Sequence, residues 1–453
     1  MLTFLYSLAW RAVPLLAPAL PGSGKLGRAL EGRRGASRVL EEWAGRARDP
    51  ARPLVWYHAA SVGEGRQAEA VLRGLRVARP GWQLAYTFSS PSAERWAATL
   101  PVDVAAYLPF DTAADTGRAL GAVKPAVLVF SATDLWPELV RQAHARGVRL
   151  AVTSATLAPT SSRRGLLARA LLGPTYAALD RVGAIDEEDA RLLAQLGVRR
   201  ERIAVTGDTR HDAACARLAA LSPDAPHLRA LRGDGSDRRP VVVAGSTWPA
   251  DERVLMPALR GAFDRGAHFR LVVAPHEPTA DHLAVLEAKL DHCMPRGMRR
   301  VRLSSLLPPG NGQPPATGNW ASGNSGATGA WDAVVVDKVG VLAELYATAT
   351  LAFVGGGFHT KGLHSVIEPA AAGVPVLFGP RWQGSRDARL LLEAGGARAA
   401  DGRNELSALL SDWLQNDAAR TVAAAAARAV VQGGRGAADR SVQLILDLVE
   451  RAS

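Results

Sequence analysis

Three glycines and a glutamate, on either side of a polar loop, carry the clearest chemical signal in the sequence. Residues 351–380 read LAFVGGGFHTKGLHSVIEPAAAGVPVLFGP and predict a strand, a glycine run, a short helix and a second strand. Gly355, Gly356 and Gly357 lack a Cβ, so their backbone amides can approach an anion such as a phosphate. The start of the helix adds positive potential, and Glu368 in its first turn can accept hydrogen bonds from a sugar diol.

A structural interpretation stands beside this functional one. A tight turn between a strand and a helix also uses glycines, and a first-turn glutamate also stabilises a helix. A glycine run alone does not separate the two interpretations, whereas the combined pattern of glycines, polar loop, Glu368 and second strand is more specific.

A second carboxylate occupies a similar place near the start of the chain. A strand is predicted over 54–60 and a helix over 67–77, and Glu64 lies between them, flanked by Gly63 and Gly65. Ligands of doubly wound domains bind at the carboxyl ends of such strands. From these residues alone, a first-turn glutamate that stabilises the helix dipole is the favoured interpretation.

Further polar turns follow predicted strands in both halves of the chain. In the second half, one turn holds Gly245, Ser246 and Thr247, and another holds His276 and Glu277. With the nearby His282, the last two could suggest a metal site, but neither spacing nor helix context fits a known zinc signature. In the first half the turns carry Asp134 and the pair Arg163 and Arg164, which either bind phosphates of an acceptor or form a solvated face.

Length and composition limit the kind of fold that can carry these turns. The 453 residues are 48% apolar, which suits two domains of about 200 residues each. Two cysteines form no disulfide framework. The formal charge of +11 is spread along the chain without a nucleic-acid motif, so an anionic lipid surface or a phosphorylated acceptor is favoured over nucleic acid. Recurring strand–helix units predict an α/β protein with two doubly wound, Rossmann-like domains that face a cleft.

Residues 1–20 predict a membrane-associated helix. They are apolar except for Thr3, Tyr6, Ser7 and Arg11, and three of these form one polar stripe. A helix lying in the membrane interface turns that stripe to the headgroups, whereas a spanning helix would bury Arg11. A basic stretch follows, and no basic residues precede the apolar run as in a signal peptide. We expect a retained anchor, with a single span as the alternative.

The motifs resemble those of the 3-deoxy-D-manno-octulosonic acid (Kdo) transferases, which have the two-domain GT-B fold. The similarity rests on the segment 355–380, on SVGE at 61–64, on the Leu-Trp-Pro loop after Asp134 and on TGDT at 206–209. This chain departs from the family at Ser365, where Asn is usual, at Ala132, where Glu or Lys is usual, and at His276-Glu277, where Arg-His-Pro is usual.

The resemblance implies transfer of Kdo from CMP-Kdo to a lipid A precursor of the lipid IVA type, with inversion and without a cofactor or catalytic metal. It implies that Glu64 is the catalytic base. It assigns acceptor binding to Ser61, Gly63, Arg66, Asp134, Arg163 and Arg164. It assigns donor binding to Gly245, Ser246, Thr247, His276, Gly355, Gly356, Gly357, His364, Ser365 and Glu368.

The sequence also predicts where the domains begin and end and where in the cell the protein is located. We expect an anchor and linker over 1–50, an acceptor domain over 51–212, a donor domain over 213–435 and a final helix over 436–453 that crosses back to the first domain. Residues 305–331 predict a flexible surface loop. The expected location is the cytoplasmic face of the inner membrane. A nucleotide-sugar epimerase and a non-catalytic basic scaffold on the membrane are the alternatives.

Overall fold

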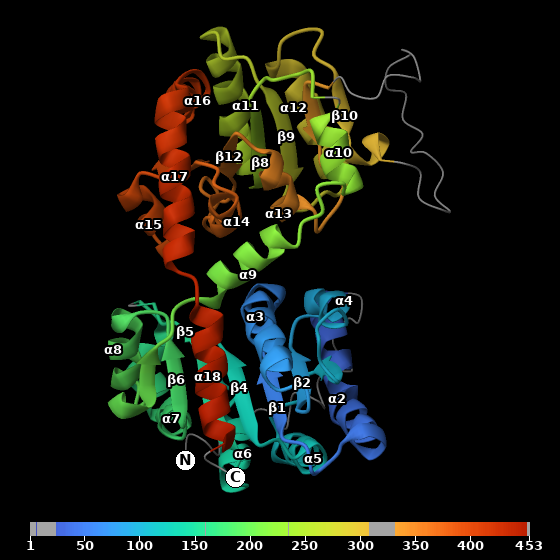
Figure 1. The fold of residues 1–453 in the computed structure, drawn as a ribbon, viewed down its shortest axis with the longest axis vertical. Coiled ribbons are helices and arrows are strands. Elements are labelled where there is room, and N and C mark those ends of the chain that lie inside the picture. The colour runs from blue at the N-terminus through green and yellow to red at the C-terminus, as the bar shows by residue number, and fades with distance from the viewer. Residues whose placement is uncertain (1–5, 7–23, 159, 234, 308–330, 451–453) are drawn as a thin grey trace. The chain divides into compact units, whose positions relative to one another are not determined.

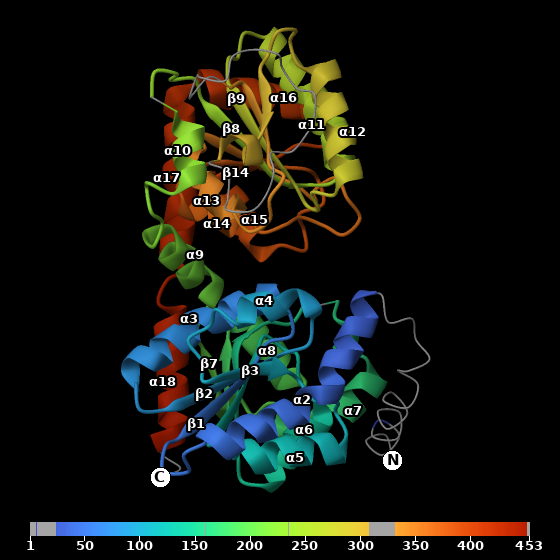
Figure 2. The same ribbon diagram turned by 90° about the vertical axis from the view of Figure 1, so that its right-hand side faces the viewer.

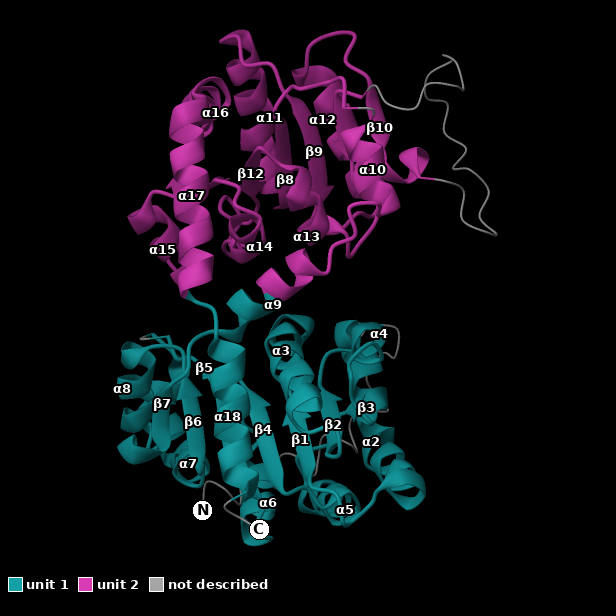
Figure 3. Cartoon of the chain, viewed as in Figure 1, with its two compact units in different colours: residues 1–213, 434–453 teal, residues 214–433 magenta. Residues whose placement is uncertain are grey.

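The chain forms two compact units, which are described separately (Figure 3). The computed structural model describes residues 6, 24–158, 160–233, 235–307 and 331–450. Unit 1 comprises Met1–Ala213 and Gly434–Ser453, and unit 2 comprises Ala214–Gly433. The sequence placed these two divisions at 212/213 and 435/436. Each unit contains one seven-stranded parallel sheet, so both are α/β folds.

The sheet of unit 1 is doubly wound around its first strand. The strand order is β3-β2-β1-β4-β5-β6-β7, and every neighbouring pair is parallel. All five residues of β1 are buried, as expected of a parallel strand that is covered on both faces. The strands are β1 (Leu54–His58), β2 (Gln83–Phe88), β3 (Val104–Tyr107), β4 (Val127–Ser131), β5 (Arg149–Ala155), β6 (Arg181–Ala184) and β7 (Ile203–Val205).

Helices cover both faces of this sheet (Figures 1 and 2). One core lies under α2 (Lys25–Ala47), α5 (Ala113–Val123), α6 (Pro137–Ala145), α7 (Leu166–Ala177) and α8 (Glu187–Gln195). The other lies under α3 (Val62–Ala78), α4 (Glu94–Ala97) and α18 (Ala437–Glu450). The last helix of the chain, α18, therefore packs beside α3 on the first sheet.

The sheet of unit 2 has the order β10-β11-β9-β8-β12-β13-β14 and is also parallel throughout. Alternate residues of its strands point to opposite cores, because side chains of a strand alternate between the two faces. The strands are β8 (Val241–Thr247), β9 (Arg270–Pro275), β10 (Arg300–Arg302), β11 (Ala333–Val335), β12 (Leu351–Val354), β13 (Val376–Phe378) and β14 (Ala397–Ala399).

Three groups of helices cover the second sheet. The first is α11 (Pro249–Asp264), α12 (Ala280–Cys293) and α16 (Arg403–Gln415). The second is α10 (Pro226–Arg232) and α13 (Leu342–Leu345). The third is α14 (Ile367–Ala371), α15 (Arg386–Ala394) and α17 (Asp417–Gly433). A further helix, α9 (Thr209–Ala219), carries the chain from unit 1 into unit 2.

Two helix boundaries differ from those expected. The helix expected over 67–77 begins at Val62, because Ser61 and Glu64 cap its first turn through reciprocal hydrogen bonds. The sequence of residues 339–347 also predicts an amphipathic helix, but the structure has the short α13 there, followed by a 3₁₀ turn, Tyr346–Thr348.

Two expected segments lie outside the described residues. They are the N-terminal anchor, apart from Tyr6, and most of the surface loop, since 308–330 is not described. Within the described part of the chain, no helix combines the length and apolarity needed to cross a membrane.

Candidate active site residues in the two units

Glu64 lies in the first turn of α3, directly after β1, and the backbone holds its carboxylate. Oε2 of Glu64 accepts the N–H groups of Ala60 (2.9 Å) and Ser61 (3.2 Å), and the Ser61 hydroxyl accepts the N–H of Glu64 at 3.5 Å. Burial raises the pKa of Glu64 and the charge of Asp134 raises it further, while the two backbone N–H groups and His58 act in the opposite direction. A carboxyl with raised proton affinity is suited to act as a base.

Asp134 keeps its negative charge through its neighbours. Its Oδ2 lies 3.5 Å from Nε2 of the buried His58 and accepts the indole N–H of Trp136 at 3.2 Å. Nδ1 of His58 lies 3.0 Å from the carbonyl oxygen of Thr87. Burial works against ionisation, yet the hydrogen bond and charge of His58, with the contributions of Trp136 and Arg163, bring the pKa of Asp134 below its ordinary value. Asp134 is thus a fixed anion in the electrostatic environment of Glu64.

A layer of hydrogen bonds fixes the start of α3. Ser131 Oγ donates to the carbonyl oxygen of Glu64 (3.2 Å), and Gln67 Nε2 donates to Asp208 Oδ1 (3.2 Å). Thr209 Oγ1 donates to the carbonyl oxygen of Gln67 at 3.0 Å. These bonds tie the turn that carries Glu64 to the end of β4 and the start of α9.

The two glycines beside Glu64 have different roles. Gly63 is exposed, and a Cβ there would meet only Ser61 Oγ at 3.8 Å, so no close contact requires a glycine. A Cβ at Gly65 would lie 2.3 Å from the ring of Trp96. Gly65 is therefore needed for packing, whereas no close contact constrains Gly63.

The acceptor residues expected from the sequence are only partly brought together. Arg163 Nη1 donates to Thr133 Oγ1 at 2.7 Å, which places it beside the Asp134 loop. Arg164 instead donates to Gln195 Oε1 of α8 at 3.4 Å. Arg66 lies on α3, half-buried, two residues after Glu64.

The loop that follows β4 is held in an unusual backbone conformation. Ala132 has a φ of 55°, in the left-handed region that few non-glycine residues adopt, and its N–H donates to the carbonyl oxygen of Thr153 at 2.9 Å. The hydrogen bond to Thr153 thus ties the loop that presents Asp134 to β5.

In unit 2, the glycine run is organised around a buried carboxylate. Asp251 is fully buried, and its two oxygens accept the N–H groups of Trp248 (2.8 Å), Gly356 (2.8 Å) and Phe358 (2.9 Å). The N–H of Gly355 donates to the carbonyl oxygen of Gly245 at 2.8 Å. The amides of Gly355 and Gly356 are thus engaged within the protein, and the expectation that they bind a phosphate directly is corrected.

Close packing explains why these positions are glycines. A Cβ at Gly355 would lie 2.2 Å from the carbonyl oxygen of Ser246, and one at Gly356 2.2 Å from that of Gly362. A Cβ at Gly357 would lie 2.4 Å from the nitrogen of Gly379. The glycine run therefore lets the loops that follow β8, β12 and β13 lie against one another.

Glu368 lies in the first turn of α14, where the sequence placed it. The Ser365 hydroxyl donates to Oε2 of Glu368. The negative charge of Glu368 adds to the effect of burial, which raises the pKa of Tyr346 well above its ordinary value. α14 has only five residues, so its dipole contributes less to anion binding than the sequence suggested.

The end of β8 carries one half-buried and one fully buried hydroxyl. Ser246 is half-buried with a φ of 54°, and a Cβ at Gly245 would collide with Tyr346 Oη at 2.1 Å. Thr247 is fully buried and its hydroxyl donates to Glu252 Oε1 at 3.2 Å. The Thr247 hydroxyl is therefore not available to contact the sugar-nucleotide donor directly. Ser246 remains a candidate residue for donor binding.

His276 and His364 belong to a group of aromatic rings around Trp248. The indole of Trp248 stacks on His276 and on His359, each with a centroid distance of 4.3 Å. His276 also stacks on His364 at 4.6 Å. The sequence singled out two of these rings, and the structure adds Trp248 and His359.

The surroundings of His282 explain its role without a metal. Its Nε2 lies 2.8 Å from Glu252 Oε1 and its Nδ1 lies 3.0 Å from the carbonyl oxygen of Glu277, while Lys289 Nζ donates to Glu252 Oε2 at 2.8 Å. The histidine and the lysine thus offset the cost of burying the carboxylate of Glu252, which is fully buried. In the described ranges, no group of three or more His, Cys, Asp or Glu side chains is arranged to hold a metal ion.

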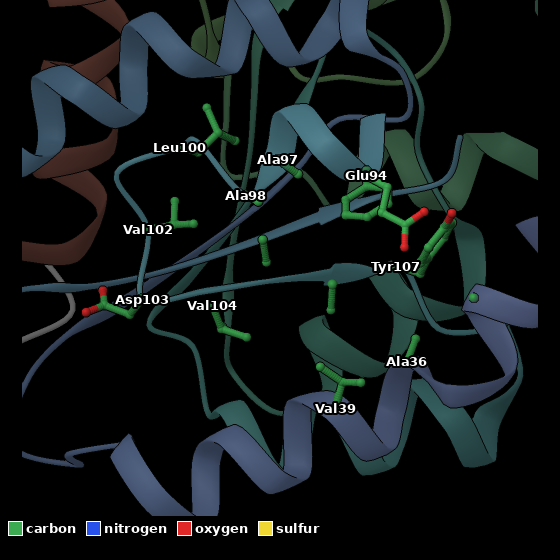
Figure 4. Close-up of a pocket in the computed structure, with 14 residues that line it drawn as sticks. Ala36, Val39, Glu94, Ala97, Ala98, Leu100, Val102, Asp103, Val104 and Tyr107 are labelled. Carbon is green, nitrogen blue, oxygen red and sulfur yellow. The ribbon is translucent and has the colours of Figure 1, made fainter. Parts of the chain in front are cut away.

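Unit 1 also contains a cavity of about 430 Å³ between α2, α4 and the edge strand β3 (Figure 4). Ala36, Val39 and Val104 line it, with Glu94 and Tyr107 at one end and Asp103 at the other. Burial raises the pKa of Tyr107, and the charge and hydrogen bond of Glu94 add to this effect. None of the site residues expected from the sequence is among the described residues that line this cavity.

The sequence did not reveal the residues that hold other side chains and loops of the site in position. His58 closes the strand before the SVGE turn, Trp136 lies within the Leu-Trp-Pro loop, and Trp248 and Asp251 follow the turn after β8. One signal was available for Asp251, since an acidic residue three positions after a helix start is typical of a capping box. The partners of His58 and Trp248 come from distant segments, so no local pattern identifies them.

The fold defines the class of protein. Two parallel, doubly wound units form the GT-B type of architecture, which solved structures share. A UDP-GlcNAc 2-epimerase from Neisseria meningitidis matches with a TM-score of 0.60 at 12% identity, over 87% of this chain and all of its own. A glycosyltransferase from Rickettsia africae matches with a TM-score of 0.54 at 10% identity, over 88% of this chain and 98% of its own. At such identities the likeness concerns the fold alone.

Sequence comparison defines the family. Residues 34–213 match the 3-deoxy-D-manno-octulosonic-acid transferase (kdotransferase) family. The Kdo transferase of Bordetella pertussis is 30% identical over 414 residues, 89% of this chain and of the relative. That of Haemophilus influenzae is 25% identical over 90% of both chains. The chain belongs to the Kdo transferase family and is a glycosyltransferase of lipopolysaccharide synthesis, which decides against the epimerase and scaffold alternatives.

Proposed function

We propose that this enzyme transfers Kdo from CMP-Kdo to a lipid A precursor of the lipid IVA type, with inversion and without a cofactor or catalytic metal. The observation that carries the proposal is the Glu64 carboxyl at the end of β1, with a pKa raised by burial and by Asp134. Such a group can remove the proton of an acceptor hydroxyl as that oxygen attacks the anomeric carbon. The new glycosidic bond forms as the bond to the CMP phosphate breaks, so one displacement inverts the anomeric centre.

The two oxygens of Glu64 have different tasks in this proposal. Oε2 is held by the N–H groups of Ala60 and Ser61, which fix the orientation of the carboxylate. Oε1 takes the proton of the acceptor hydroxyl. Arg163, beside the Asp134 loop, contributes positive charge for an acceptor phosphate, and Arg164 would have to leave Gln195 in order to join it.

Unit 2 binds the CMP-Kdo donor. Glu368, oriented by the Ser365 hydroxyl, accepts hydrogen bonds from the ribose diol. Ser246, His276 and His364 surround the donor phosphate. The glycine run shapes this site through loop packing, and the amides of Gly356 and Phe358 stay bound to Asp251.

Single-turnover transfer with CMP-Kdo and a lipid A precursor tests the assignment of the base. Glu64→Gln keeps the size of the side chain and removes the base, so we expect the rate to fall by about 10²-fold or more while CMP affinity is retained. Glu69→Gln is the matched control, since Glu69 lies on the same helix and pairs with Arg73 at its surface. A Glu64→Gln variant that transfers at a rate near the wild type would reduce Glu64 to a helix cap.

Titration of CMP against UDP by calorimetry tests the donor. The wild-type chain should bind CMP in preference to UDP, and NMR of the product should show an inverted anomeric configuration. Preference for UDP would move the enzyme to another donor class, and a retained configuration would exclude the single displacement.

We further propose that residues 1–20 hold the enzyme on the cytoplasmic face of the inner membrane. The support is the apolar stretch with its polar stripe and the basic residues that follow. Deletion of residues 1–20 should release the protein from the membrane fraction, with CMP affinity within about twofold of the wild type. Sedimentation of the shortened chain with membranes, at high as well as low salt, would contradict this anchor.

A further inference from the structure

Four aromatic rings from three separate segments of unit 2 form one stack. Trp248 precedes α11, His276 follows β9, and His359 and His364 lie in the loop after β12. Trp248 and His364 are nearly coplanar, with an interplanar angle of 10° and a centroid distance of 6.2 Å, and His276 stacks on both rings. Lys361 Nζ lies 4.8 Å from the indole centroid.

The edge contact between Trp248 and His364 determines where His364 carries its proton. Nε1 of Trp248 lies 2.9 Å from Nε2 of His364. An indole N–H can only donate, so Nε2 of His364 must offer its lone pair. A neutral imidazole has one protonated nitrogen, and here that nitrogen is Nδ1.

The environment keeps this imidazole neutral. Burial lowers the pKa of His364 to about 4, and the positive charges available to His276, His359 and Lys361 lower it as well. These three groups approach His364 from the loops after β9 and β12. The carboxylate of the adjacent Asp251 is occupied by three backbone N–H groups. At neutral pH, His364 is therefore a single tautomer without charge.

We infer that Trp248 is a positioning residue of the donor site, because its indole N–H fixes His364 in the Nδ1–H tautomer and so makes His364 a hydrogen-bond donor to an oxygen of the donor phosphate. The inference rests on the proposed donor site in unit 2. With the opposite tautomer, Nδ1 would turn a lone pair toward the anion, and the two would repel each other.

Stacking gives Trp248 a second task, which a test must separate from the first. His276 and His359 pack on the indole face, and this packing would survive replacement of the indole by another aromatic ring. Trp248→Phe keeps an aromatic face and removes the N–H. Trp413→Phe is the matched control, since among the described residues the buried indole N–H of Trp413 has no acceptor.

The experiment combines a spectroscopic with a binding measurement on the full-length protein in detergent. Two-bond ¹⁵N–¹H spectra of histidine-labelled protein show which ring nitrogen is protonated, and His364→Gln assigns the signal among the ten histidines. We expect protonation at Nδ1 in the wild type and in Trp413→Phe, and loss of that fixed tautomer in Trp248→Phe. CMP affinity of Trp248→Phe should fall by about three- to thirtyfold, with Trp413→Phe near the wild type.

Each possible result has a separate meaning. A wild-type His364 protonated at Nε2, in a chain that binds CMP, overturns the inference alone, and this result needs no variant that must fold. Equal CMP affinity of Trp248→Phe and the wild type overturns the positioning role of Trp248. A wild-type chain that binds no CMP removes the proposed donor site, and the inference with it.

Discussion

At the scale of single residues, Glu64 and Asp134 are coupled by charge. Asp134 stays ionised because His58 and Trp136 stabilise its carboxylate, and its charge raises the pKa of Glu64. In the proposed mechanism the base is Glu64 without its proton, so the transfer rate should rise as the pH passes upward through this pKa. Under this proposal, Asp134 influences the pH at which the enzyme becomes active.

Asp134→Asn should move the acid limb of the pH profile to lower pH. Loss of the negative charge lowers the pKa of Glu64, so the base form persists in more acidic solution. Profiles of kcat/KM for both enzymes, measured with the same substrates, give the difference, because titration of the substrates is common to both. Asp439→Asn, in the first turn of α18, is the control with the same change in charge. An acid limb that moves to higher pH would contradict the coupling.

At the scale of elements, one carboxylate connects the start of α11 with the loop after β12. Asp251 binds the N–H groups of Trp248, Gly356 and Phe358 at once and has no exposed surface. The loop carries His359 and His364, so its position relative to Trp248 depends on these bonds. Asp251 therefore holds in place the loop of the proposed donor site.

Asp251→Asn should loosen that loop. The amide group of Asn cannot accept at both positions, so at least one buried N–H loses its partner, at a cost of about 1–3 kcal/mol in the free energy of unfolding. CMP affinity should fall by about tenfold for the same reason. Denaturant unfolding and calorimetry measure the two effects, and Asp264→Asn, at the exposed end of α11, serves as the control. A stable variant with unchanged CMP affinity would show that the loop is held by other contacts.

The same elements show how far sequence reasoning reaches. The strand, glycine run and Glu368 of the segment 351–380 were predicted because each leaves a local pattern of apolar residues and turn residues. The bonds from Asp251 to Gly356 and Phe358 span 105 and 107 residues, and that from Trp248 to His364 spans 116. Such contacts arise only when parallel strands bring their carboxyl ends together. The sequence therefore predicts a phosphate loop at the glycine run. In the structure, however, the amides of Gly355 and Gly356 already donate to acceptors within the protein.

At the scale of the whole molecule, the chain crosses between its two units twice. Its last helix, α18, returns to unit 1 and completes the cover of the first sheet. The apolar face of α18 covers β4, β5 and β6 beside α3. Ile445, at the centre of that face, is fully buried. The stability of unit 1 therefore depends on residues that lie more than 200 positions after the rest of that unit.

Ile445→Ala should reduce the free energy of unfolding of unit 1 by about 2–5 kcal/mol, because it leaves a cavity between α18 and the sheet. Hydrogen exchange resolved along the sequence should show the loss of protection in β4, β5 and α3, with β8 and β12 unaffected. Gln443→Ala changes an exposed residue of the same helix and provides the control. Equal destabilisation of both sheets would show that the two units unfold together.

The return of α18 also imposes an order on biosynthesis. A ribosome releases residues 1–213 first and residues 434–453 last, so the first sheet leaves the exit tunnel without the helix that covers it. Unit 2 is contiguous and can fold while its predecessor still exposes Val55, Val129 and Ala151 of its uncovered face. During translation of about 220 residues, this nascent enzyme is a natural client for a chaperone. A released chain that ends at Gly433 should therefore be cleaved by protease within the first 213 residues and be protected beyond them.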